Sequence, residues 1–369
     1  MNYAVLTNID QIDSIGFIPT VIVGFYESDK EKLFSQCSET LKARFPDVDI
    51  IGCSSESNIY DSIPYVDVNR THPCIYMCIE MKKGSYKLQL FPDQEKQKIP
   101  VEKNKKYSAI VLSSRYGNAL EQIIVQLQEN IGKNSFFGAI AGAKSSDIKG
   151  GSIFYNGEYL SESTLVWLID QEDYSLKGIS AHDFDPVGFD LEITRTEGFK
   201  IIEIEHRPAL DMIESMIGTL SLKTIESYDQ PFFITPFNDH NHSFKKPISS
   251  ILSIDRKAKT ITLFKKVSKG DKLKLAIPFS REKQIDQLDK FSHLVTNDSI
   301  AFLFACVAYK GHWGQMEPIY IMRLAKNIYI PFIGLHSFGE IGPLDPQDLS
   351  VLQNQTLTLA VLTEKREST

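Results

Sequence analysis

The sequence contains few cysteines, and their spacing supports neither a disulfide framework nor a shared metal site. There are five in 369 residues, an odd number, and none forms a CxxC motif. Cys74 and Cys78 stand four residues apart in CIYMC, a pattern typical of a strand, which would separate them by about 13 Å. Cysteines of this kind are typical of reduced, buried thiols in the cytosol.

Long hydrophobic runs are also missing. The longest, Ser299 to Tyr309, lies between Asp298 and Lys310 and is too short to span a membrane. The first residues, MNYAVLTNIDQIDSIG, carry acids where a signal peptide needs bases. We therefore expect a cytoplasmic protein without a membrane partner.

The chain has no excess of basic residues, and its formal net charge is −7 at pH 7. A basic cluster from Arg256 to Lys274 interleaves lysines with strand-forming residues, which is typical of a solvated hairpin edge. We therefore expect no nucleic-acid partner. With 42% hydrophobic and 24% charged residues, the composition excludes a disordered or collagen-like chain, and the length favours two domains.

Signatures of catalysis are absent from the sequence, which lacks Gly-x-Ser-x-Gly, a Walker A sequence, GxGxxG after a strand, and HExxH. Cys53, Cys306 or a serine of a glycine-rich loop could act as a nucleophile, although a lone buried cysteine more often belongs to the core. His240 and His242 could share a metal, but no third ligand is evident. We predict a protein that is not an enzyme and has no catalytic residues.

One structural unit occurs three times. A strand, an amphipathic helix, a second strand and a loop of small residues follow one another in Val21 to Ser57, Ala109 to Asp147 and Ile300 to Gly342. Each copy has the size of a βαβ unit. In the first copy, Ser28 and Glu31 predict a capping box with Ser28 as the N-cap residue.

The segments between these copies favour antiparallel strands. Asn156-Gly157 lies between two alternating stretches and predicts a tight hairpin, and Ile248 to Val267 predicts another. The expected fold class is therefore α+β: α/β units plus antiparallel hairpins, in layered sheets with flanking helices.

A domain boundary is expected after the helix from Pro208 to Gly218, with the polar stretch Ser221 to Gln230 as a linker. The predicted domains are residues 1–218 and 219–369.

Three loops share one chemical character, because each follows a buried strand and combines glycines, small residues and one charged side chain. They are Gly52 to Glu56, Gly138 to Lys144 and Gly334 to Glu340. Ligands of open α/β sheets bind beyond the carboxyl ends of the strands, and glycine allows close backbone approach. For a single loop a tight turn is the simpler explanation, but three similar loops favour a shared site.

We therefore predict a small-molecule site formed by these loops. Serine hydroxyls would contact the ligand, Lys144 would pair with an anion, and Glu340 would pair with an ammonium group, which together suit a zwitterionic amino acid. The candidate binding residues are Gly52, Cys53, Ser54, Ser55, Gly138, Gly142, Lys144, Cys306, His336, Ser337, Gly339 and Glu340.

Two histidines could have a different role. His336 lies in the third loop, and His182 lies in GISAHDFDPVG. Either could anchor a ligand carboxylate or bind haem iron axially. The alternative for each is a hydrogen-bonded structural histidine.

Several stretches together resemble the FIST family, named for F-box and intracellular signal transduction proteins. The resemblance runs from about Thr20 to Leu362, as an N-terminal FIST domain followed by a C-terminal one. It is carried by IIGCSSE (50–56), FFGAIAGAKSSD (136–147), residues 177–210, GLHSFGEIGPL (334–344) and QNQTLTLAVL (353–362).

The resemblance implies an intracellular sensory module that binds a small ligand, with amino acids proposed, and reports to a separate partner such as a histidine kinase or a cyclic-dinucleotide enzyme. Some bacterial members that resemble this architecture are haem proteins that sense nitric oxide and regulate a kinase, so haem is the alternative ligand. The sequence departs from the family pattern at Glu56-Ser57, where relatives often have Gly-Glu. It also departs after Cys306, where Val-Ala-Tyr-Lys replaces an arginine-bearing pattern.

Overall fold

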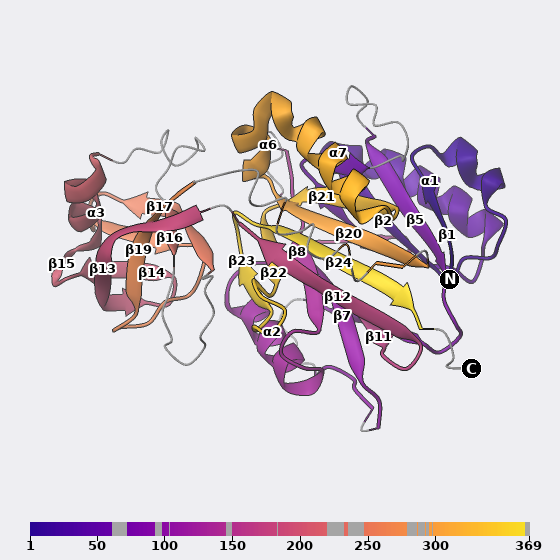
Figure 1. The fold of residues 1–369 in the computed structure, drawn as a ribbon, viewed down its shortest axis with the longest axis horizontal. Helices are drawn as coiled ribbons and strands as arrows, with labels where there is room; N and C mark the ends of the chain where they lie inside the picture. The colour runs from indigo at the N-terminus through magenta and orange to yellow at the C-terminus, as the bar shows by residue number, and fades with distance from the viewer. Residues whose placement is uncertain are drawn as a thin grey trace.

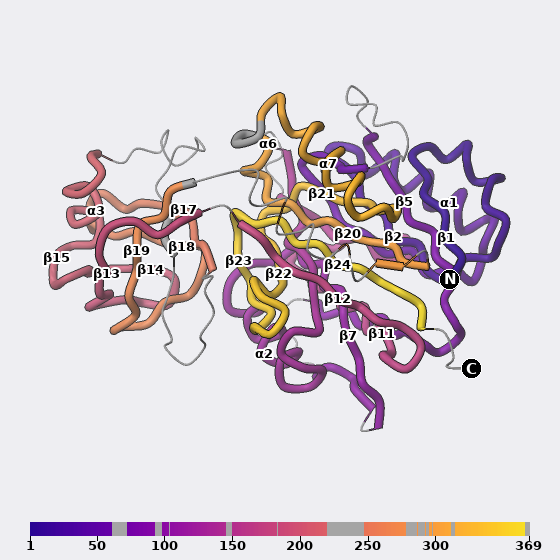
Figure 2. Tube along the Cα trace, in the orientation of Figure 1, coloured from indigo at the N-terminus to yellow at the C-terminus, as the bar shows by residue number. Residues whose placement is uncertain are grey.

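The chain folds into a large body and a smaller lobe, seen at the left of Figure 1, and the first and last described strands, β1 (Asn2–Leu6) and β24 (Leu357–Glu364), both lie in the large body. Figure 2 follows the same path as a tube. The computed structural model describes residues 1–60, 72–92, 98–102, 104–144, 150–182, 184–219, 232–234, 247–278 and 298–365, with residues 286, 292, 295 and 296.

The first sheet of the large body holds the first βαβ unit. Its strands, in spatial order, are β1 (Asn2–Leu6), β5 (Cys74–Glu80), β2 (Val21–Glu27), β3 (Asp49–Ser55), β9 (Ile153–Tyr155) and β10 (Glu158–Leu160). The 3₁₀ helices η1 (Ile9–Ser14) and η2 (Ser28–Lys30) and the helix α1 (Glu31–Arg44) accompany it. Strands β2 and β3 are parallel and are connected through α1.

The second sheet holds the second unit. Its order is β23 (Val351–Gln353), β22 (Gly339–Gly342), β8 (Phe136–Ile140), β7 (Tyr107–Ser113), β11 (Thr164–Asp170) and β6 (Tyr86–Phe91). Helix α2 (Asn118–Asn130) connects the parallel strands β7 and β8.

The third sheet holds the third unit. Its order is β12 (Tyr174–Ala181), β24 (Leu357–Glu364), β20 (Ser299–Cys306), β21 (Phe332–Ser337) and β4 (Asn58–Tyr60). Helix α6 (Ala308–Trp313), the 3₁₀ helix η4 (Gly314–Met316) and helix α7 (Glu317–Ile328) connect the parallel strands β20 and β21.

The three sheets share one apolar core, and each buries its other face under its own helix. In β2, Val23 and Phe25 point into the shared core, whereas Ile22 packs with Phe34 of α1. The same alternation occurs in β7 beneath α2 and in β20 beneath α6 and α7. Because both faces are covered, these strands consist of continuous apolar residues, as the sequence predicted.

The smaller lobe is a closed barrel. Its order is β13 (Phe184–Glu197), β19 (Lys272–Pro278), β16 (Phe232–Ile234), β17 (Ile248–Asp255), β18 (Thr260–Leu263), β14 (Lys200–Ile204) and β15 (Arg207–Pro208), and β13 also pairs with β14. The register of β13 shifts between Val187 and Leu191, where Gly188 has φ +77°. Such a bulge bends the long strand so that it can pair on both sides. Helix α3 (Ala209–Ile217) contributes to the apolar core of the lobe.

The predicted α+β class and the three βαβ units are confirmed, as is the hairpin turn at Asn156-Gly157, whose φ values are +47° and +106°. The predicted capping box is wrong. Ser28 lies inside η2, the N-cap of α1 is Lys30, and the Ser28 hydroxyl instead accepts a hydrogen bond from Lys144 N.

The predicted domains 1–218 and 219–369 are interleaved in the sheets. Strand β24 pairs with β12, β22 with β8, and β19 with β13. The two predicted domains therefore do not form separate sheets. The boundary at residue 218 stays a prediction from the sequence. The expected linker, Ser221 to Gln230, lies outside the described residues.

No helix among the described residues is long and apolar enough to cross a membrane.

Candidate functional site

The first and second glycine loops are joined through Ser54. Its hydroxyl donates to Gly142 O at 2.8 Å, and Gly142 N donates to Ser54 O at 2.9 Å. Ser152 N donates to the same hydroxyl at 2.9 Å. The neighbouring Ser55 donates to Asn58 Oδ1 at 2.6 Å. Ser54 and Ser55 are fully buried, so their hydroxyls link protein segments in this structure.

The third loop forms backbone hydrogen bonds with both of the other loops. Glu56 N donates to His336 O at 3.1 Å, and His336 N donates to Ser57 O at 2.9 Å. Phe338 N donates to Ile140 O at 3.1 Å. Three loops far apart in the sequence therefore meet at the carboxyl ends of their strands.

The junction of the loops is tightly packed, and Gly142 lies at its centre. A Cβ atom there would lie 2.1 Å from His336 O and 3.0 Å from Glu56 N. A Cβ at Gly52 would lie 2.2 Å from Gly24 O. Glycine is needed at these positions because backbones touch. The sequence predicted that glycine lets a ligand approach the backbone closely. In the structure these glycines instead let two backbone segments approach each other.

The other two glycines among the candidates are equally enclosed. A Cβ at Gly138 would lie 1.9 Å from Val111 O, and one at Gly339 would lie 2.5 Å from the ring of Phe264. Gly138 thus permits close strand packing, whereas Gly339 lies against a residue of the barrel lobe.

Lys144 already has anionic partners. Its Nζ lies 2.6 Å from Glu27 Oε2 and 2.8 Å from Asp29 Oδ1. Burial opposes the charge of Lys144, but its hydrogen bonds to Asp29 and Glu27 raise its pKa overall. The predicted anion-binding role would therefore require a ligand to compete with two carboxylates.

Glu340 is fully buried and has the geometry of a protonated acid. Ser337 Oγ lies 2.7 Å from Oε1, and Thr356 donates to Oε2 through its hydroxyl at 2.7 Å and its backbone N at 3.2 Å. Ser337 Oγ also lies 3.1 Å from Ala305 O. One hydroxyl hydrogen serves only one of these acceptors, whereas a proton on Oε1 satisfies both contacts, because Glu340 then donates to Ser337 and Ser337 donates to Ala305. Burial raises the pKa of Glu340 to about 8, against the lowering effect of the hydrogen bonds from Ser337 and Thr356.

Gln355 is a site residue that the sequence did not single out. Its side-chain Oε1 is buried and accepts no hydrogen bond from the described residues, while its Nε2 donates to Ser250 Oγ at 3.3 Å. Its backbone is left-handed, with φ +59°, and its carbonyl accepts from Tyr309 OH at 2.6 Å. A buried acceptor without a donor costs about 1–3 kcal/mol, and left-handed non-glycine residues cluster at functional sites. The only sequence signal was its place in the QNQT stretch quoted for the family resemblance.

Gln355 and its neighbour also connect the large body to the barrel lobe. Asn354 Oδ1 accepts from Ser250 N at 3.2 Å, and Asn354 Nδ2 donates to Ser250 Oγ at 2.7 Å. Tyr116, which precedes α2, meets Phe264 of the lobe edge to face, with ring centroids 6.4 Å apart. We call these five residues the lobe junction.

Comparison with known families decides the identity of the chain. A family model described as the FIST N domain matches residues 20–207, and one described as the FIST C domain matches residues 209–343. The chain belongs to the FIST family. FIST domains are associated with sensory signal transduction and small-ligand binding. A comparison with curated proteins finds no match.

The two stretches that the sequence analysis expects to depart from the FIST pattern meet in space. Lys310 Nζ lies 2.6 Å from Glu56 Oε2 in a partly exposed ion pair. Ser57 Oγ lies 2.9 Å from His336 Nδ1. Both departures therefore belong to one polar cluster beside the third loop.

The candidate cysteines of this FIST protein are poor nucleophiles. Cys53 points into the shared core, and burial raises its pKa far above the ordinary range of a thiol. Burial, with the nearby Glu340, also raises the pKa of Cys306. A nucleophilic cysteine needs a stabilised thiolate, and these surroundings oppose one.

The described contacts of His336 do not fit an axial haem ligand. Nδ1 of His336 contacts Ser57, its Nε2 lies 2.9 Å from Glu317 Oε1, and the ring is buried. His182 is also buried, and its Nδ1 accepts from Phe184 N at 3.2 Å. An axial ligand needs a ring nitrogen that is open to a porphyrin pocket.

No group of three or more potential metal ligands occurs among the described residues, and His240 and His242 lie outside them.

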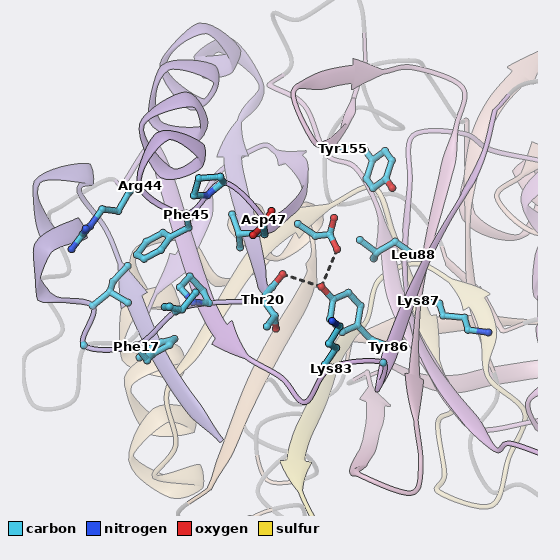
Figure 3. Close-up of a pocket in the computed structure, with 18 residues that line it drawn as sticks. Phe17, Thr20, Arg44, Phe45, Asp47, Lys83, Tyr86, Lys87, Leu88 and Tyr155 are labelled. Atoms are coloured by element: carbon cyan, nitrogen blue, oxygen red, sulfur yellow. Dashed lines mark hydrogen bonds between the residues drawn. The ribbon is translucent and has the colours of Figure 1, made fainter.

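A surface pocket of about 960 Å³ lies at the other end of the first sheet. Figure 3 shows Phe17, Arg44, Tyr86 and Tyr155 around it. Tyr86 OH lies 2.9 Å from Thr20 O and 2.9 Å from Asp49 Oδ2. None of the candidate binding residues lines this pocket.

Proposed function

We propose that this FIST protein is an intracellular sensor that binds a small amine-bearing molecule, such as an amino acid, between its lobes. The site would lie where the glycine loops, Glu340 and the lobe junction come together. The protein would report to a separate signalling partner, for which a histidine kinase or a cyclic-dinucleotide enzyme is the expectation from the family.

The observation that carries the proposal is the unsatisfied Oε1 of Gln355 at the lobe junction. Buried amide oxygens are nearly always paired with a donor. Gln355 stands next to Thr356, which donates to the carboxyl group of Glu340. An ammonium group supplies several N–H donors, so it matches an amide oxygen and a carboxyl group better than a carboxylate or phosphate ligand would.

The protonated state of Glu340 gives binding a chemical signature. An ammonium ligand that pairs with this side chain favours the carboxylate, so Glu340 gives up its proton to solvent as the ion pair forms. Binding near pH 7 therefore releases up to one proton per site. A neutral or anionic ligand would leave Glu340 protonated.

The lobe junction also offers a way to produce a signal. Asn354 and Gln355 of the large body hold Ser250 of the barrel. A ligand that satisfies Gln355 in only one arrangement of the lobes shifts the population toward that arrangement. The partner would read that shift.

A thermal-shift screen of amino acids and simple amines, followed by calorimetric titration of the hits, tests the proposal. Gln355→Ala and Glu340→Ala should each weaken binding at least about tenfold, the loss of one good hydrogen bond. Gln347→Ala, at an exposed loop position, serves as a control and should bind normally. Unchanged affinity in Glu340→Ala for every hit would overturn the site. A Soret band after haem addition would favour the haem alternative instead.

A further inference from the structure

The side chains of Ser57, His336 and Glu317 form a chain of contacts near the third loop, which we call the relay. Neither the family match nor the proposed ligand site requires it. Ser57 Oγ lies 2.9 Å from His336 Nδ1 in a hydrogen-bonding geometry. On the other side of the ring, Glu317 Oε1 lies 2.9 Å from His336 Nε2, without the alignment of a hydrogen bond. The order serine, imidazole, carboxylate is that of an activated hydroxyl nucleophile.

The charge of Glu317 decides which ring nitrogen carries the proton. Burial alone would raise the pKa of Glu317, but His336 and the nearby Lys310 lower it overall, so the side chain is a carboxylate at neutral pH. A carboxylate 2.9 Å from Nε2 favours a hydrogen on that nitrogen. In the neutral ring Nδ1 is then bare and accepts the Ser57 hydroxyl hydrogen at 2.9 Å. The backbone oxygen of Ser57, 3.2 Å from the same nitrogen, is an acceptor that would instead pair with a protonated Nδ1.

The fold holds each member of the relay. His336 is in β21, whose register with β4 places Leu335 opposite Asn58, so His336 lies beside Ser57. Glu317 is the first residue of α7, where the positive end of the helix dipole stabilises a carboxylate. Ser57 is half-buried and Glu317 is 19% exposed at its side chain. The imidazole is thus enclosed, while Ser57 and Glu317 are only partly buried.

A cationic side chain, that of Lys310, lies next to the relay. Lys310 pairs with Glu56, the residue before Ser57, and is 36% exposed at its side chain. A developing oxyanion on a substrate bound at Ser57 would be favoured by such a positive charge.

We propose that Ser57 is a nucleophile that takes the acyl group of a small carboxylic ester, with His336 as general base and acid and Glu317 as the residue that orients and stabilises the imidazolium. The proposal is independent of the amine site at the lobe junction. Sequence patterns for nucleophiles do not identify this serine, because its partners His336 and Glu317 come from segments that are distant in the chain.

The reaction uses only the ester and water. Ser57 Oγ attacks the carbonyl carbon while its proton passes to His336 Nδ1, forming a tetrahedral oxyanion. The C–O bond to the alcohol then breaks, and the alcohol leaves with the proton from Nδ1. Water attacks the acyl-serine in the same way, which releases the carboxylic acid and restores Ser57.

The test uses a fluorophosphonate probe, intact-protein mass spectrometry and the release of p-nitrophenol from p-nitrophenyl acetate. The wild type should gain one phosphonyl group, and Ser57→Ala should gain none. His336→Gln should slow labelling by about 10²-fold or more. Glu317→Gln should slow it less, and Glu317→Asp should recover part of the loss. Ser35→Ala changes a half-buried serine of α1 without a histidine partner and should label like the wild type.

Labelling that persists in Ser57→Ala, or a folded wild type that resists the probe under conditions that label a known serine esterase, would overturn the proposal. Circular dichroism spectra of each variant show whether a loss of labelling reflects unfolding. A Ser57→Ala variant that binds amines normally but no longer reacts separates this site from the amine site.

Discussion

At the scale of single residues, the protonation of Glu340 is the feature with the clearest consequences. Its carboxyl group is surrounded by Ser337 and Thr356 in an arrangement that a neutral acid satisfies fully. The sequence predicted Glu340 as a site residue because it ends the third glycine loop. It could not predict the neutral state, because that state follows from burial between strands of distant segments.

Glu340→Gln should stabilise the protein at alkaline pH. The folded pKa of about 8 lies above the ordinary value of 4.5, so between these two values the unfolded chain loses a proton that the folded chain keeps. Stability from this group is therefore present below pH 4.5 and is lost progressively up to about pH 8, by on the order of a few kcal/mol. Glutamine can copy the hydrogen bonds of the neutral acid and does not titrate. Urea unfolding at pH 5 and pH 8 should show a smaller loss of stability for the variant, and equal losses would contradict the assignment.

Gln355 and Ser57 show the limits of the sequence at this scale. No sequence pattern assigned either residue a role, and their roles come from an unpaired oxygen and from a histidine 279 residues away from Ser57 along the chain. For Lys144 the sequence predicted that its loop meets the other glycine loops, and the structure brings them together. The sequence did not predict that Lys144 pairs with Glu27 and Asp29, which lie in the first βαβ unit.

At the scale of elements, periodicity identified the three βαβ units and most hairpins, because burial on both faces imposes long apolar strands. The helix start at Ser28 was wrong because the hydroxyl bonds to the second glycine loop and not to its own helix. The sequence predicted that the three loops meet to form a small-molecule site. The observed meeting point is packed backbone, which is consistent with tight turns as well as with a ligand site nearby.

Gly142→Ala should weaken the contact between the loops. The added Cβ would meet His336 O and Glu56 N, which are backbone atoms that cannot rotate away. Overpacking of this kind costs about 1–3 kcal/mol or more. Gly16→Ala is a suitable control because nothing lies within 4 Å of its Cβ position. Urea unfolding should show a loss only for Gly142→Ala, and equal stability of the two variants would argue against a close loop junction.

At the scale of the whole molecule, three sheets surround one core, and the lobe junction connects the barrel to it through hydrogen bonds and the contact of Tyr116 with Phe264. The sequence predicted layered sheets and two modules but not the pairing of strands across the modules. Such pairings as β24 with β12 join residues far apart in the chain, and local patterns carry no information about them.

Asn354→Ala should loosen the attachment of the barrel. The substitution removes the acceptor of Ser250 N and a donor to Ser250 Oγ, at a buried position. The expected cost is about 1–3 kcal/mol. Hydrogen exchange at Ser250 and its neighbours in β17 should accelerate while exchange in β2 stays unchanged. Asn130→Ala, an exposed change in α2, should alter neither, and unchanged exchange in β17 of Asn354→Ala would contradict this role.

The central claim is that an amine-bearing ligand binds between the lobes, where Gln355 and Glu340 lie. The most direct measurement is a crystal structure of the protein with the best amine from the screen. We predict density for the amine nitrogen within hydrogen-bonding distance of Gln355 Oε1 and of the Glu340 carboxyl group. Density for the ligand in the pocket around Phe17 and Tyr86, with Gln355 still unpaired, would contradict the claim.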